Sequence, residues 1–163
     1  MNPHRIIIYT DGSCDTQHAV GAWAAILFVQ GTKIVLQGEA ENTTNNRMEL
    51  MAVIEAIEYV DKHYPDATLE IYTDSQYVVR LPERQEKLLA NNFQTKKGTL
   101  IQNCDLVQIL LQKLGNTKVA FSKVAAHQGK NVSEITKFNT EVDRICRKHV
   151  REFVKENYKG ISD

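Results

Sequence analysis

The sequence predicts an α/β fold in which helices pack on a mixed β-sheet. Two observations carry this prediction: β-rich runs follow one another near the N-terminus, and later runs alternate with segments of helical periodicity. The chain has 163 residues, 42% of them hydrophobic, which is enough to bury a core. We expect one domain over residues 1–160 and a short tail over residues 161–163.

The first three strands are predicted to form a meander. Residues 5–10 are an apolar, β-rich run that stops at the turn signal Asp11-Gly12-Ser13. Residues 22–30 and 33–37 are typical of two further strands, and Gln30-Gly31-Thr32 is the hairpin turn between them.

The remaining elements alternate between helix and strand. A helix is expected to open in the cap-rich segment 42–46 and to end before Pro65. Strands are predicted over residues 68–73 and 118–125, with a loop over 126–132 after the second. Further helices are predicted over 75–81 (ended by Pro82), 99–114 and 134–158.

Composition excludes several classes of protein. The apolar runs are too short to span a bilayer, and the N-terminus lacks the layout of a signal peptide. Three widely spaced cysteines indicate free thiols in a reducing compartment, so we expect a cytoplasmic protein. The net charge of zero combines −7 over residues 1–74 with +7 over residues 75–163. This asymmetry suggests a cation site beside a surface that attracts anions, although two solvated surfaces would give the same counts.

Two aspartates occupy equivalent places in a local repeat. Asp11 and Asp74 each follow an apolar strand that finishes in Tyr-Thr-Asp. If the two strands are parallel and adjacent, both carboxylates emerge at the same end of the sheet, where ligands bind in open α/β folds. Each Asp could instead merely begin a turn, but the repeated context favours the shared site.

Two further acids lie on helices. At about 100° per residue, Glu49 falls on the apolar face of its helix, within about 40° of Val53 and Val60. A buried carboxylate needs a partner, although Glu49 could alternatively cap the helix in Asn46-x-x-Glu49. Asp143 lies at the edge of the buried stripe of the last helix. If Asp11, Glu49, Asp74 and Asp143 converge, Mg²⁺ or Mn²⁺ would relieve their repulsion.

Three segments together resemble type 1 ribonuclease H. They are residues 9–14 (YTDGSC), 43–52 (TTNNRMELMA) and 72–78 (YTDSQYV), followed by His127 and by Asn139-x-x-x-Asp143. The resemblance covers about residues 5–150. It implies a ribonuclease H-like fold, with a five-stranded mixed sheet made of a three-strand antiparallel meander plus two parallel strands, flanked by helices. It also implies an endonuclease, expected to be monomeric, that hydrolyses the RNA strand of RNA–DNA hybrid duplexes with two Mg²⁺ ions or Mn²⁺ in their place.

The resemblance also assigns roles to individual residues. The metal ligands would be Asp11, Glu49, Asp74 and Asp143, and His127 would assist proton transfer or product release. Asn45 and Gln76 match residues that read the minor groove of the hybrid, and Cys14 matches a position close to the RNA strand. Glu49 would also contact a ribose 2′-hydroxyl. Finally, Thr44, Arg47 and Asn103 match a pocket that holds a DNA-strand phosphate.

The chain departs from the family pattern in its substrate-facing segments. Residues 15–20 replace a glycine- and proline-rich loop, and Ala125-Ala126 replaces Lys-Gly before the loop histidine. The basic segment 83–98 contains Arg84, Lys87, Lys96 and Lys97, but acidic residues dilute it and the family's tryptophans are absent. We therefore expect weaker or more salt-sensitive hybrid binding.

Three other functions would be compatible with these motifs. The chain could be a catalytically silent binding module on the same fold, against which the intact acidic set argues. It could be another two-metal nuclease or strand-transfer enzyme, which cleavage of DNA duplex would reveal. It could also be a phosphohydrolase that acts on other substrates, which a hybrid-binding assay would test.

Overall fold

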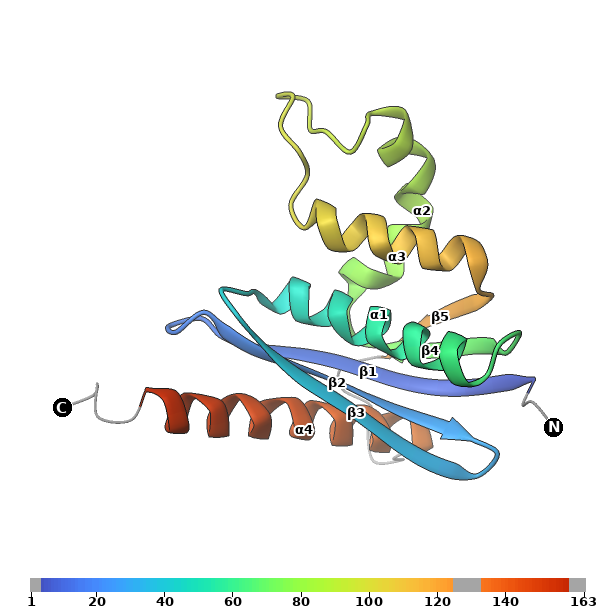
Figure 1. Cartoon of the computed structure of the whole chain (residues 1–163), viewed down its shortest axis with the longest axis vertical. Helices are drawn as coiled ribbons and strands as arrows, with labels where there is room; N and C mark the ends of the chain where they lie inside the picture. The colour runs from blue at the N-terminus through green and yellow to red at the C-terminus, as the bar shows by residue number, and fades with distance from the viewer. Residues whose placement is uncertain (1–3, 125–132, 159–163) are drawn as a thin grey trace.

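The computed structural model describes residues 4–124 and 133–158 and contains one five-stranded sheet with helices on both faces (Figure 1). The strands are β1 (Arg5–Asp15), β2 (Val20–Val29), β3 (Thr32–Glu41), β4 (Thr68–Thr73) and β5 (Val119–Lys123). The helices are α1 (Asn45–His63), α2 (Gln76–Ala90), α3 (Cys104–Asn116) and α4 (Glu134–Asn157). The strand order is β3-β2-β1-β4-β5, in which β1, β2 and β3 are antiparallel and β4 and β5 run parallel to β1. The predicted mixed sheet is therefore confirmed.

The two faces of the sheet carry separate cores. Successive side chains of a strand point to opposite faces, so Ile8 packs toward α1 whereas Tyr9 packs toward α4. Helices α1, α2 and α3 cover the first face, and α4 is the one helix of the described residues that lies across the second (Figure 1). Trp23 is buried against α1. Within the described part of the chain, no helix combines the length and apolarity needed to cross a bilayer.

Strand β1 continues past the point where the sequence predicts a turn. Asp11-Gly12-Ser13 stays in the strand, because residues 11–15 pair with residues 20–24 of β2. The parallel pairing with β4 stops earlier, at Tyr9 and Tyr72. The prediction of a turn at residue 11 is therefore wrong, and the β1–β2 hairpin extends beyond the end of β4.

The helices on the first face also differ from the prediction. Helix α2 runs through Pro82 to Ala90, because Val78, Leu81 and Leu88 form a buried stripe that continues past the proline. Helix α3 starts only at Cys104, since Asn103 adopts the left-handed conformation (φ 60°) and interrupts the helix there. The outer half of α2 and the loop that follows it project away from the sheet (Figure 1).

Candidate active site

The register of the parallel strands brings two aspartates to one end of the sheet. Tyr9 of β1 pairs with Tyr72 of β4, and Asp11 and Asp74 each lie two residues further along their chains. Asp11 is 3% exposed and belongs to β1, while Asp74 is half-buried and immediately follows β4. This placement confirms that the repeated Tyr-Thr-Asp sequence brings both aspartates to the same end of the parallel β1–β4 pairing, although β1 itself continues past Asp11.

A close contact between β1 and α1 adds Glu49 to this pair. A Cβ atom on Gly12 would lie 2.6 Å from the backbone nitrogen of Glu49, so only glycine lets the helix approach the strand this closely. The helix is capped by the side chain of Thr44, which accepts from the backbone N–H of Arg47. The alternative in which Glu49 caps this helix is therefore wrong. One carboxylate oxygen from each of Asp11, Glu49 and Asp74 lies within 4.8 Å of the others.

The fourth predicted acid reaches the same cleft from the opposite face of the sheet. Asp143 of α4 lines a cleft of about 570 Å³ together with Asp11, Glu49 and Asp74. Its Oδ1 atom accepts a hydrogen bond from Nε of Arg147, at 3.1 Å. Asp143 lies outside the group of oxygens within 4.8 Å, so the structure places it at the edge of the cluster rather than within it.

Burial and mutual repulsion make the carboxylates hard to ionise. Burial raises the pKa of Asp11, and the charge of Asp74 raises it further. Burial also raises the pKa of Glu49, followed by the charges of Asp11 and Asp74. The pKa of Asp74 is raised by burial and then by Asp143. Without a cation, therefore, some of these groups hold protons that ordinary surface carboxylates would lose.

The cluster has the chemistry of a divalent cation site. The buried Oδ2 of Asp11 and Oε2 of Glu49 have no hydrogen-bond partner among the described residues. Unpartnered buried oxygens are costly, and a hard cation with oxygen ligands would satisfy both of them. The donor set thus fits Mg²⁺ or Mn²⁺.

Three residues were expected to contact the minor groove or the RNA strand of the hybrid, and two of them line this cleft. Cys14 of β1 and Asn45 at the start of α1 lie along its walls. Gln76, at the start of α2, is not part of the cleft lining. Its amide oxygen, when turned toward Arg80, accepts from Nε of that guanidinium at 3.1 Å. Cys14 and Asn45 therefore lie in the cleft where the resemblance leads us to expect them. Gln76 instead faces Arg80 on its own helix, which the sequence did not show.

The predicted phosphate pocket forms a second cluster, but one of its residues is already paired. Arg47 donates to Asn103 at 3.5 Å and, through both arms of its guanidinium, to Asp105 at 2.9 Å. This contact lowers the pKa of Asp105 to about 2 and raises that of Arg47. Thr44 is the helix cap three residues before Arg47. Sequence reasoning missed Asp105, although an acid in the first turn of a helix near a predicted arginine is a usable signal.

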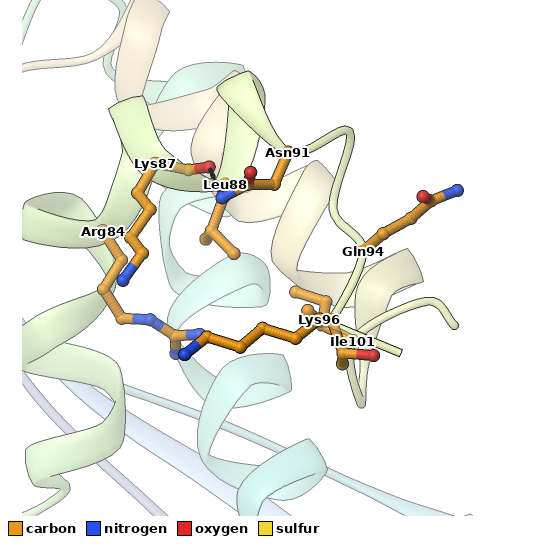
Figure 2. Close-up of a pocket in the computed structure, with 8 residues that line it drawn as sticks. Arg84, Lys87, Leu88, Asn91, Gln94, Lys96 and Ile101 are labelled. Atoms are coloured by element: carbon orange, nitrogen blue, oxygen red, sulfur yellow. Dashed lines mark hydrogen bonds between the residues drawn. The ribbon is translucent and has the colours of Figure 1, made fainter. Parts of the chain in front are cut away.

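The basic segment forms a pocket of its own, away from the acidic cleft. Arg84 and Lys87 of α2 and Lys96 of the following loop line a space of about 570 Å³ over Leu88 and Ile101. Figure 2 shows the side chains of Arg84 and Lys96 extending toward each other beneath Leu88. The predicted basic residue Lys97 is not part of this lining.

Several residues near the cleft were not singled out from the sequence. Asp15 lines the cleft, and its Oδ1 accepts from the backbone N–H of His18 at 3.1 Å. The His18 ring contacts the ring of Tyr158, just past the end of α4, with centroids 4.4 Å apart and planes tilted by 40°. Arg147 and Arg151 of α4 also line the cleft. His127 and Ala125-Ala126 lie outside the described residues.

Comparisons with known proteins agree with this geometry. The family model described as RNase H matches residues 3–151. A protein named ribonuclease H from Caldicellulosiruptor saccharolyticus is 38% identical over 149 residues, which cover 90% of this chain and 97% of that protein. A ribonuclease H from Thermoanaerobacter sp. is 35% identical, with 93% of this chain and 94% of that protein covered.

Solved structures show the same fold. LC9-RNase H1, a type 1 RNase H with the type 2 active-site motif, superposes with a TM-score of 0.76 at 21% identity, covering 93% of this chain and 74% of that one. A foamy viral protease-reverse transcriptase solved in complex with an RNA/DNA hybrid gives a TM-score of 0.70 at 17% identity, covering 89% of this chain and 20% of that one. From the family match and the identity to curated relatives, the chain belongs to the ribonuclease H family of enzymes.

Proposed function

We propose that the protein is an endonuclease that hydrolyses the RNA strand of RNA–DNA hybrids, with two divalent cations bound by Asp11, Glu49, Asp74 and Asp143. The observation that carries the proposal is the convergence of three carboxylate oxygens within 4.8 Å in a cleft of a ribonuclease H family member. The hybrid bound to the foamy viral relative of the same fold supports the substrate class.

The carboxylates bind and orient the cations, and they lose protons when the cations bind. Because the pKa values of Asp11, Glu49 and Asp74 are raised, cation binding is accompanied by loss of the protons that these groups hold. When bound, the cations supply Lewis acidity that activates a water and stabilises the leaving oxygen. His127, which follows β5 and precedes α4 in the sequence, would assist proton transfer or product release.

Discrimination between the two strands would use both residue clusters. In the acidic cleft, Cys14 would lie close to the RNA strand, Asn45 would read the minor groove of the hybrid, and Glu49 would contact a ribose 2′-hydroxyl. Gln76, from α2, would read the minor groove next to Asn45. In the second cluster, Thr44, Arg47 and Asn103 would hold a phosphate of the DNA strand, with Asp105 keeping the Arg47 guanidinium oriented.

An end-labelled RNA–DNA hybrid tests this function directly. Purified protein is incubated with Mg²⁺, with Mn²⁺ or with EDTA, beside RNA duplex, DNA duplex and the Asp11→Asn variant as controls. The expected result is metal-dependent cleavage of only the RNA strand in the hybrid. Hybrid binding without cleavage under either metal would instead support a binding module, and cleavage of DNA duplex would indicate a different nuclease.

A further inference from the structure

Two arginines of α4 lie in the acidic cleft with no role in the chemistry proposed above. Arg147 and Arg151 are one turn apart, so they share a face of the helix, and both line the cleft. Arg147 donates to Asp143 at 3.1 Å. Arg151 is exposed and has no hydrogen-bond or ion-pair partner within the described ranges 4–124 and 133–158.

These arginines do not serve to neutralise the carboxylate cluster. Among the described residues, neither guanidinium forms an ion pair with Asp11, Glu49 or Asp74. Arg147 reaches only Asp143, at the edge of the cluster, and its side chain is 66% exposed. An exposed pair of this kind adds little to stability. The two guanidinium groups are therefore available to a ligand that enters the cleft.

We propose that Arg147 and Arg151 bind successive backbone phosphates of the cleaved strand, next to the scissile phosphate. This inference rests on the proposed function, because it assumes that the scissile phosphate lies at the carboxylates. From Asp143 to Arg147, and again from Arg147 to Arg151, the helix advances about 6 Å. That rise is comparable with the separation of neighbouring phosphates along one strand, and the planar guanidinium fork suits a phosphate oxygen pair.

The charges that line the cleft indicate which ligand the two arginines bind. A cleft lined by five acids repels a polyanion except where positive charge lies, and α4 supplies Arg147 and Arg151 along one wall. Asp143, Arg147 and Arg151 follow one another along α4 at intervals of about one turn. Asp143 is proposed to help bind the cations at the scissile phosphate, so the two arginines lie further along the strand that is cut. The proposed pocket at Arg47 and Asn103 serves the other strand, so the two sites do not compete.

Hybrid binding, measured by fluorescence anisotropy in Mg²⁺, tests the arginine pair. Asp11→Asn is used as the background so that the substrate survives, and Arg151→Ala is compared with Arg144→Ala. Arg144 is exposed on the same helix but is not part of the cleft lining. We expect Arg151→Ala to raise the Kd for the hybrid by about 3- to 10-fold. The slope of the logarithm of the association constant against the logarithm of the salt concentration should become less steep by about 0.7–0.9, as loss of one phosphate contact predicts. Arg144→Ala should change neither quantity comparably.

A neutral methylphosphonate linkage, moved one position at a time along the RNA strand, then locates the phosphate. When the neutral linkage replaces the phosphate that Arg151 contacts, the protein with Arg151 and the Arg151→Ala variant should bind the hybrid equally well. On the unmodified hybrid, Arg151→Lys should bind more tightly than Arg151→Ala. Equal losses for Arg151→Ala and Arg144→Ala, or a loss that persists at every modified linkage, would overturn the proposal. If the wild-type chain cleaves hybrids while Arg151→Ala binds normally, only the arginine pair is refuted. If the wild-type chain neither binds nor cleaves, the proposed function itself fails.

Discussion

Removing one carboxylate from the acidic cluster is expected to stabilise the metal-free protein. Two unit charges 4.8 Å apart repel by about 3.5 kcal/mol at an effective dielectric constant of about 20. Partial protonation reduces this repulsion at neutral pH. We therefore expect Asp11→Asn to raise the free energy of unfolding by about 2 kcal/mol in EDTA, which corresponds to a rise in Tm of about 4–8 °C for a chain of this size.

The pH dependence gives this prediction its sign. Because the pKa of Asp11 is raised in the folded state, the folded chain binds more protons than the unfolded chain above about pH 4. Stability of the metal-free wild-type protein should therefore fall as pH rises toward the raised value, and the advantage of Asp11→Asn should grow over the same range. Thermal unfolding followed by circular dichroism at about pH 5 and about pH 8 measures both effects.

A matched control separates the cluster from charge removal in general. Asp66 is exposed and has φ 73°, a conformation that asparagine tolerates well, so Asp66→Asn removes a charge without strain. Its Tm should change little at either pH. Mg²⁺ should raise the Tm of the wild-type protein more than that of Asp11→Asn. An Asp11→Asn protein that is no more stable than wild type at about pH 8 in EDTA would refute the electrostatic reasoning.

Catalysis, packing and one ion pair give three further tests. Asp11→Asn should keep the fold and lower kcat by more than about 100-fold, since about 10- to 100-fold is typical for residues that only support a metal ligand; retained cleavage would remove Asp11 from the proposed site. Gly12→Ala should destabilise the chain in urea by about 1–3 kcal/mol or more, because its Cβ would meet backbone at 2.6 Å. Gly115→Ala, within α3 at a position where an added Cβ would have no neighbour within 4 Å, should instead stabilise it by about 0.5–1 kcal/mol; equal effects would show that the contact at Gly12 is unimportant. Arg47→Ala should return the pKa of Asp105 from about 2 to near its ordinary value, measured by NMR titration of the carboxyl carbon, and an unchanged pKa would contradict the ion pair.

The parts of the site that follow local patterns could be predicted from the sequence. Asp11 and Asp74 each follow the sequence Tyr-Thr. Because Tyr9 pairs with Tyr72 in the parallel register, the two aspartates lie at the same level along their strands. Glu49 could be predicted because helical periodicity places it on the same face as buried apolar residues, whatever the helix packs against. The fold class followed from the order of strand and helix patterns.

The remaining features depend on contacts between distant segments. The extension of β1 to Asp15 depends on pairing with residues 20–24 of β2. The local sequence at residues 11–13 is typical of a turn and does not show that pairing. Helix α2 passes through Pro82 because apolar residues on both sides of it are buried by other elements, which local propensity does not show. The ion pair between Arg47 and Asp105 joins residues 58 positions apart, so its existence depends on how α3 packs on α1.

The fourth carboxylate illustrates how the fold completes a site that its motifs only outline. Asp143 comes from the face of the sheet opposite to α1, and its position depends on how α4 is seated. Val142 and Cys146 of that helix are fully buried against β1 and β2, and the Cys146 thiol donates to the backbone oxygen of Asp11 at 3.3 Å. The helix that carries Asp143 is thus joined directly to the strand residue that carries the central acid. Because both layers contact β1 at residues 11 and 12, a change in packing on either face would move a carboxylate relative to Asp11. The acidic cluster is therefore a property of the two-layer packing around β1 as much as of the four acids themselves.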